Sequence, residues 1–178
     1  STVGTVTEIY DYLRLLLARA GTPHCHRCGR PITSQSIDQI VDTVMSLTED
    51  TRVIILAPLI NGQKGSHEKL FRKLKKEGFA RVRVDGDILE LEDVGKLSKT
   101  KKHTIDVVVD RLIVKATIRK RLADSLELAL AQSGGIASVH IPGKDTILFS
   151  EKSACLKCDI SYPEFTPASF SFNSPQGA

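Results

Sequence analysis

The stretch Thr104-Ile-Asp-Val-Val-Val-Asp-Arg-Leu-Ile-Val114 decides how this chain folds. Three consecutive valines interrupt the alternation of apolar and polar residues, so we expect a long strand that is buried on both faces at its centre. The segments on either side of this strand carry further helix and strand patterns.

Upstream, apolar residues recur at helical spacing over 36–45, which predicts an amphipathic helix. The β-branched run 52–57 predicts a buried strand that Pro58 stops, and 61–65 is expected to be a flexible loop. A basic helix with one apolar stripe is predicted over 66–78. Residues 81–89 predict a hairpin that turns at Asp85-Gly86.

Downstream of the central strand, residues 118–133 predict an amphipathic helix that Gly134-Gly135 ends. Residues 138–141 and 146–150 predict two more strands. The segment 34–148 is therefore expected to form a compact, mixed α/β unit, and the fold class is α+β.

The two flanks of this unit each carry a cysteine pair. A helix is predicted from the capping box Thr5-Val-Thr-Glu8 to Gly21. Cys25 and Cys28 follow it, and Cys155 and Cys158 lie beyond the unit. Because a Cys-x-x-Cys turn aims two sulfurs at one point, the two pairs predict one structural zinc ion with four thiolate ligands. The mixed α/β domain would then be inserted into a small, zinc-bound helical base.

Other interpretations of the four cysteines remain open. They could form two disulfides, two separate zinc knuckles completed by ligands elsewhere, or inert thiols. A reducing cytosol disfavours disulfides. His24 and His26 are alternative ligands next to the first pair, although an adjacent histidine would strain the turn.

Composition restricts the possible functions. Twenty-five Lys and Arg against twenty-one Asp and Glu give a charge of +4, which permits contact with DNA without arguing for it. No apolar run is long enough to cross a bilayer and no signal peptide is recognisable, so we expect a cytoplasmic protein without a membrane partner. The chain starts at Ser1 and stops without a helix cap, so we expect a piece of a longer protein.

Two strings superficially resemble nucleotide-binding motifs. Gln132-Ser-Gly-Gly-Ile136 follows a helix and is best explained as a glycine helix stop, and Pro142-Gly-Lys-Asp-Thr146 lacks the context of a phosphate loop. We therefore expect no nucleotide or catalytic site within these residues, and an independent enzyme is the least favoured function.

Several longer strings resemble the bacterial UvrA family, a component of the excinuclease ABC complex. They cover essentially the whole chain, in order: 1–16, 56–58, 64–67, 101–111, 121–125 and 170–175. The resemblance implies an ABC-type ATPase of nucleotide excision repair that dimerises, binds DNA and ATP outside these residues, and loads the UvrB subunit. Residues 1–33 and 149–178 would belong to its first signature domain, and 34–148 would be the inserted UvrB-binding domain.

The family often has Cys-x-x-His where this chain has Cys25-x-x-Cys28, and both sets can hold zinc. A further Cys-x-x-Cys follows the family string that matches 174–178. That pair keeps open the alternative in which the two knuckles of this chain have separate partners.

The leading hypothesis is a protein-interaction module that docks UvrB by charge complementarity. Candidate contact residues are polar and lie at predicted loops, the hairpin and a strand end: Lys64, His67, Arg81, Arg83, Asp85 and Arg111. Asp110 and Arg111 could instead form a structural ion pair. The alternative function is direct DNA binding through the basic face between Lys64 and Lys102.

Overall fold

The computed structural model describes residues 3, 8–20, 22–32, 34–155, 157–158 and 160–161. The chain divides into two compact units, of which one comprises residues 1–33 with 152–178 and the other residues 34–151. The expected inserted segment ended at residue 148. The unit extends further because Phe149 and Ser150 complete a strand and are buried.

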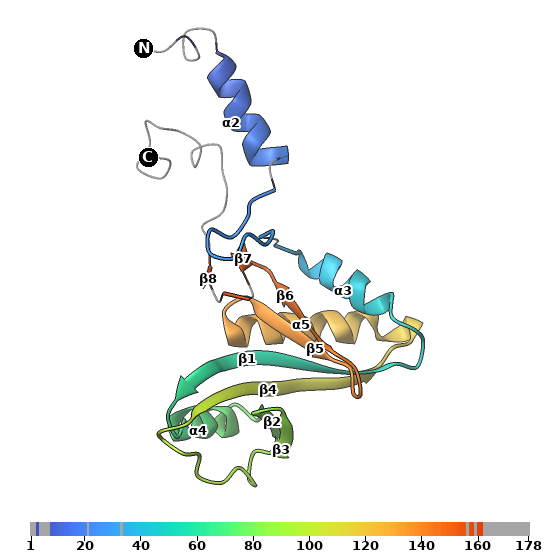
Figure 1. The fold of residues 1–178 in the computed structure, drawn as a ribbon. Helices are drawn as coiled ribbons and strands as arrows, with labels where there is room; N and C mark the ends of the chain where they lie inside the picture. The colour runs from blue at the N-terminus through green and yellow to red at the C-terminus, as the bar shows by residue number, and fades with distance from the viewer. Residues whose placement is uncertain are drawn as a thin grey trace. The chain divides into compact units, whose positions relative to one another are not determined.

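A six-stranded antiparallel sheet forms the centre of the 34–151 unit (Figure 1). Its strands are β1 (Arg52–Lys64), β2 (Arg81–Val84), β3 (Asp87–Glu90), β4 (Lys102–Ile113), β5 (Ile136–His140) and β6 (Thr146–Ser150), in the order β3-β2-β4-β1-β5-β6. The central strand predicted from the valine run is β4. Its residues 105–108 are buried on both faces, as predicted.

The predicted end of the first strand at Pro58 was wrong, and so was the flexible loop at 61–65. β1 continues to Lys64 and pairs with β4 as far as Lys64 opposite Lys102. Pro58 is tolerated because β5 pairs only with residues 54–56 of β1, so at Pro58 the ladder continues on one side alone. The register of the β1–β4 ladder shifts around Pro58 and Ile60, as in β-bulges.

Three α-helices accompany the sheet, α3 (Ile37–Met45), α4 (Glu68–Lys76) and α5 (Arg119–Ser133), and the short 3-10 helix η1 (Ala116–Ile118) directly precedes α5. Ser36 starts α3 with a capping box, in which its hydroxyl accepts from the Gln39 N–H and the Gln39 side chain accepts from the Ser36 N–H. Gly134 ends α5 with φ of 75°, which confirms the predicted glycine stop.

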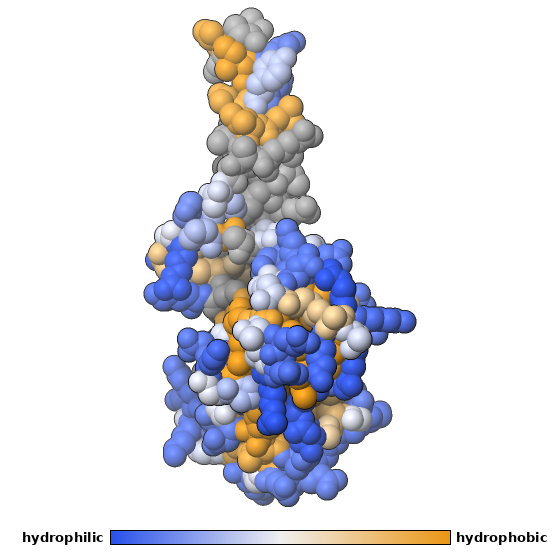
Figure 2. Space-filling model, turned by 90° about the vertical axis from the view of Figure 1, so that its right-hand side faces the viewer, coloured by the Kyte–Doolittle hydropathy of each residue, from blue (hydrophilic) through white to orange (hydrophobic). Residues whose placement is uncertain are grey.

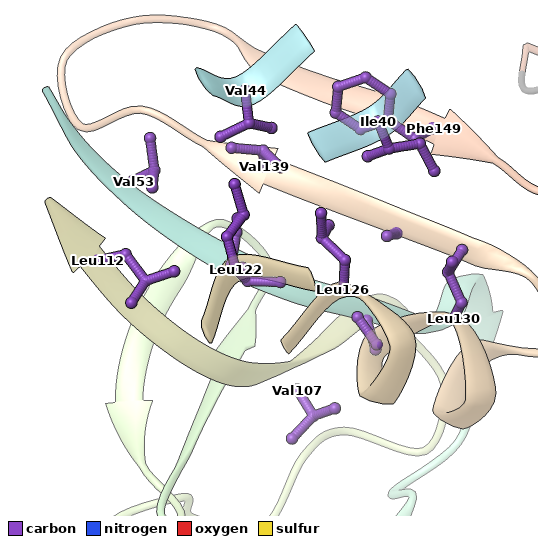
Figure 3. Close-up of a cluster of buried hydrophobic side chains, with 14 of the residues drawn as sticks. Ile40, Val44, Val53, Val107, Leu112, Leu122, Leu126, Leu130, Val139 and Phe149 are labelled. Atoms are coloured by element: carbon purple, nitrogen blue, oxygen red, sulfur yellow. The ribbon is translucent and has the colours of Figure 1, made fainter. Parts of the chain in front are cut away.

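The hydrophobic core lies between these helices and the sheet, and Figure 3 shows its central side chains. α5 contributes Leu122, Leu126 and Leu130, and α3 contributes Ile40 and Val44. Phe71 and Leu74 bury the predicted apolar stripe of α4. On the face that Figure 2 shows, most of the surface is hydrophilic, with smaller apolar areas.

Strands β2 and β3 form the predicted hairpin. Val84 pairs with Asp87, so Asp85 and Gly86 are its two-residue loop, with φ of 53° and 103°. Positive φ at both positions is the type I′ arrangement that favours Asp-Gly. Val82 and Val84 are buried, whereas Arg81 and Arg83 lie on the other face of β2.

The other unit contains helix α2 (Ile9–Ala20) and a short sheet of β7 (Ala154–Cys155) and β8 (Ile160–Ser161). The helix was predicted from Thr5 onward, and residues 5–7 lie outside the described residues. Among the described residues, no helix is long and apolar enough to cross a membrane.

Candidate functional site

The first cysteine pair lies in a tight turn between residues 23 and 32. The N–H of Cys25 donates to the Arg30 carbonyl and the N–H of Gly29 donates to the Cys25 carbonyl, both at 2.8 Å. Gly29 has φ of 69°, a conformation that glycine adopts without strain. This turn brings both sulfurs to the same side of the chain.

The second pair lies at the turn between β7 and β8. Cys155 ends β7 opposite Ile160, and the N–H of Cys158 donates to the Cys155 carbonyl at 3.2 Å. Cys25 and Cys155 are buried with Ile32, and Cys28 and Cys158 pack against them. The two turns therefore present one compact cluster of thiols.

The four sulfurs lie within 4.8 Å of one another, close enough to hold one metal ion. The Sγ atoms of Cys28 and Cys155 are 3.5 Å apart. A tetrahedral site with Zn–S bonds of about 2.3 Å has sulfur–sulfur edges of about 3.8 Å. All four cysteines are free thiols, and a disulfide would need sulfurs about 2.05 Å apart. The donor set fits a four-thiolate metal centre.

The electrostatics of the cluster favour a cation. Hydrogen bonding with Cys28, burial, and the neighbouring thiols of Cys155 and Cys25 raise the pKa of Cys158 to about 12. Crowded thiols resist deprotonation because their thiolates repel one another, and a divalent cation removes that repulsion by binding them.

The two neighbouring histidines are not members of this cluster. Both His24 and His26 are exposed, and Nδ1 of His24 donates to the Thr22 carbonyl at 2.8 Å. In the described part of the chain, the group of possible metal ligands consists of the four cysteines.

A second candidate site is a hollow of about 350 Å³ in the 34–151 unit, which we call the arginine hollow. Arg81, Arg111 and Arg121 line it, together with Asp110 and apolar or backbone surface from Gly78, Phe79, Ala80, Val108 and Val109. Strand β2, strand β4 and helix α5 each contribute one arginine. Two of the residues proposed from sequence, Arg81 and Arg111, are thus brought together.

Asp110 holds one of these arginines in place. Nε and Nη2 of Arg121 donate to the two oxygens of Asp110 at 2.9 and 2.8 Å, and the Ser125 hydroxyl donates to Oδ2 at 2.8 Å. Burial would raise the pKa of Asp110, but these bonds and the Arg111 N–H lower it below its usual value. The alternative considered from the sequence, an Asp110–Arg111 ion pair, is wrong, because Asp110 forms its ion pair with Arg121.

The guanidinium groups of Arg81 and Arg111 are more available to a binding partner. Arg81 contacts the exposed carboxylate of Glu90 at 2.5 Å, an ion pair at the surface. Arg111 is exposed and contributes only its backbone N–H to Asp110. Arg121 lies in the family-matching string 121–125, but it was not proposed as a contact residue, because the packing of α5 against β4 is a tertiary contact.

Arg83 and Asp85, also proposed as partner contacts, have internal partners. Nε of Arg83 donates to buried Asp106 at 2.7 Å, and Nη1 donates to Thr146 at 3.2 Å. Burial raises the pKa of Asp106, and the Arg83 charge opposes that rise. The Asp106 contact joins β2 to β4, and the Thr146 contact joins β2 to β6.

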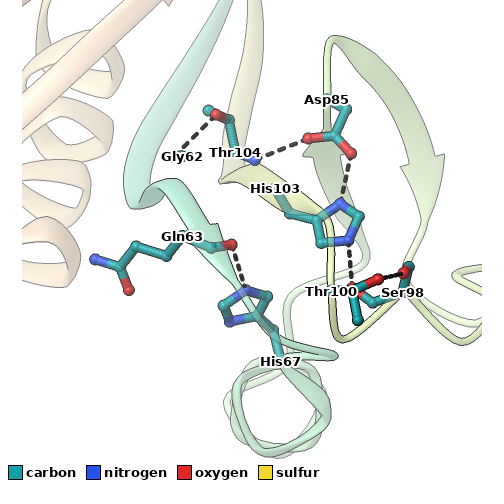
Figure 4. Close-up of polar contacts among 8 residues, drawn as sticks. All are labelled: Gly62, Gln63, His67, Asp85, Ser98, Thr100, His103 and Thr104. Atoms are coloured by element: carbon teal, nitrogen blue, oxygen red, sulfur yellow. Dashed lines mark hydrogen bonds and ion pairs between the residues drawn. The ribbon is translucent and has the colours of Figure 1, made fainter.

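Asp85 binds His103, which no sequence pattern singled out (Figure 4). Nδ1 of His103 lies 2.7 Å from Oδ2 of Asp85, and Nε2 lies 2.9 Å from the Ser98 carbonyl. Both neighbours are acceptors, so both ring nitrogens donate only when the imidazole is protonated. These bonds tie the β2–β3 turn and the 91–101 connector to β4.

The remaining proposed contacts, Lys64 and His67, lie away from the arginine hollow at the end of β1 and before α4. Lys64 is exposed, and Nε2 of His67 lies 3.2 Å from the Gln63 carbonyl. The rings of His67 and His103 are 6.3 Å apart, edge to face. Residues 142–145 form the turn between β5 and β6.

Comparison with protein families identifies the kind of domain to which this fold belongs. A family model described as the UvrA interaction domain matches residues 35–143, which is most of the 34–151 unit. The chain therefore belongs to the UvrA interaction domain family.

Relatives that are all named UvrABC system protein A match over 99–100% of this chain. UvrABC system protein A of Clostridium perfringens is 56% identical over 178 residues, and that of Clostridium tetani is 53% identical, each covering 99% of this chain. The Bacillus subtilis protein is 51% identical over the whole chain. The chain spans 19% of the length of each of these relatives.

Proposed function

We propose that this chain is the module through which a UvrA-type protein docks UvrB during nucleotide excision repair. Family membership supports an interaction role, and the arginine hollow supplies a surface for it. The observation that carries the proposal is the convergence of Arg81, Arg111 and Arg121 on one hollow from three separate elements.

The chemistry of the hollow suits an acidic partner segment. Arginine presents a planar fork of donors that binds carboxylates in bidentate fashion, and arginine and aromatic residues are enriched among residues that dominate interface energies. Phe79 and Val109 add partly buried apolar surface beside the guanidinium groups. An acidic side chain of UvrB would be held by Arg111 and Arg81, with Arg121 already oriented by Asp110.

We propose that the four cysteines bind one structural zinc ion. The ion would hold together the two cysteine turns. In sequence, the unit that contains these turns joins the 34–151 unit at residues 33–34 and 151–152. ATP binding, DNA scanning and dimerisation would be activities of the longer protein.

Calorimetric titration of UvrB with the full 178-residue chain tests the docking role. We expect one chain to bind one UvrB, and Arg111→Glu to weaken binding at least tenfold because it reverses an exposed charge in the hollow. Lys120→Glu is the matched control, since it makes the same charge change at an exposed position of α5 outside the hollow. No binding by the unaltered chain would refute the docking role, and equal losses in both variants would refute the hollow as its site.

A further inference from the structure

Lys64 and Lys102 lie directly opposite each other where β1 and β4 end their ladder. Both are exposed. Like charges directly opposite on neighbouring strands destabilise a sheet. Neither lysine forms an ion pair in the described part of the chain, so no internal contact offsets this repulsion.

More positive charge lies on the helix that follows β1 and on the connector that precedes β4. Arg72 and Lys75 of α4 line a shallow groove with Lys96 of the 91–101 connector. All three are exposed and are likewise outside the ion pairs of the described residues. Glu68 is the carboxylate that lines this groove. We call Lys64, Arg72, Lys75, Lys96 and Lys102 the basic rim.

The basic rim is held in a defined arrangement. Phe71 of α4 is buried and lines the groove with Leu91 and Val94 of the connector. His103 binds the connector through the Ser98 carbonyl, and its ring meets that of His67 just before α4 (Figure 4). The helix and the connector therefore present their charges together.

We propose that the basic rim contacts the phosphate backbone of double-stranded nucleic acid. Four of its five charges are lysines, which act as compact point charges toward phosphates and lack the planar fork that reads guanine edges. The rim contains no exposed aromatic side chain on which unstacked bases could lie, so a duplex fits better than a single strand. This site uses neither the arginine hollow nor UvrB.

A salt titration of a labelled DNA duplex of about 20 base pairs against the full chain tests the proposal. If the five charges each neutralise one phosphate, affinity falls about 500-fold between about 50 and 200 mM salt, and about 40-fold after two contacts are removed. Arg72→Glu/Lys75→Glu should show the shallower dependence. Lys120→Glu/Lys144→Glu is the matched control and should retain the steep one.

A second variant separates binding from folding. Lys64→Thr/Lys102→Thr removes the opposed charges, so we expect it to unfold at the same temperature as the unaltered chain or higher, while binding the duplex more weakly. The proposal is overturned if the unaltered chain does not bind at low salt, or if the rim and control variants lose affinity equally. It is also overturned if a single strand binds more tightly, or if polyglutamate of equal charge competes as well as the duplex, which would indicate an acidic protein partner.

Discussion

Nδ1 of His103 and Oδ2 of Asp85 are 2.7 Å apart, and this contact joins the β2–β3 turn to the first buried residue of β4. The Asp85 hydrogen bond, followed by the Ser98 carbonyl, raises the pKa of His103. The His103 hydrogen bond, followed by the Thr104 N–H, lowers the pKa of Asp85. Each partner therefore favours the charged form of the other.

This contact predicts how stability depends on pH. Because the pKa of His103 is raised in the folded state, its contribution to folding stability is complete below the unfolded-state pKa of about 6.5. That contribution is lost as pH rises through the pKa of the folded state. The lowered pKa of Asp85 means that its contribution is lost only as pH falls through a value below 3.8. We expect His103→Gln to lower the melting temperature more at pH 6 than at pH 9. An equal effect at both pH values would contradict a protonated His103.

The proposal that the four cysteines bind one zinc ion predicts about one zinc per chain by elemental analysis. Cys28→Ser should abolish stoichiometric zinc and release the remaining thiols to a thiol reagent, because a three-sulfur set binds the ion more weakly. His26→Ser is the matched control and should keep the zinc, since His26 is outside the thiol cluster. Folded chain without zinc, or zinc lost equally in the histidine variant, would contradict a four-cysteine site.

The Arg83–Asp106 ion pair is mostly buried, with 17% and 5% of the two side chains exposed. Arg83→Met should destabilise the chain by about 3 kcal/mol at pH 7 in denaturant unfolding, because it leaves a buried carboxylate without its partner. Burial already raises the pKa of Asp106, and loss of Arg83 raises it further. Protonation of Asp106 removes the unpaired buried charge, so the loss of stability caused by Arg83→Met should be smaller at pH 5 than at pH 7. A loss of stability that does not depend on pH would contradict this account.

Leu126 is fully buried between α5 and the sheet, whereas Leu128 of the same helix is 43% exposed. Leu126→Ala should lower the free energy of unfolding by about 2–5 kcal/mol through lost burial and a residual cavity. Leu128→Ala should change it by less than about 0.5 kcal/mol. Similar effects of the two substitutions in denaturant unfolding would show that α5 is packed differently.

Local patterns were sufficient to predict the helices, the Asp85-Gly86 hairpin and the buried centre of β4, because each depends on residues close in sequence. The extension of β1 through Pro58 could not be predicted, since it depends on β5 pairing only with residues 54–56. The cysteine pairs predicted a shared site from chemistry alone. Which arginines converge depends on the pairing of β2 with β4 and on the packing of α5. Arg83 was therefore among the proposed contacts although it binds Asp106, and Arg121, which lines the hollow, was not.

The claim that the arginine hollow is the surface that docks UvrB can be tested by photo-crosslinking. Ile113 is 43% exposed, two residues beyond Arg111 on β4, and a benzophenone side chain placed there should crosslink to UvrB in the full chain. The same side chain at Leu128 is the control and should not crosslink. We predict crosslinking from position 113 and none from position 128, and we predict that the crosslink from position 113 is lost when Arg111→Glu is added. Crosslinking from Leu128 with none from position 113 would contradict the claim.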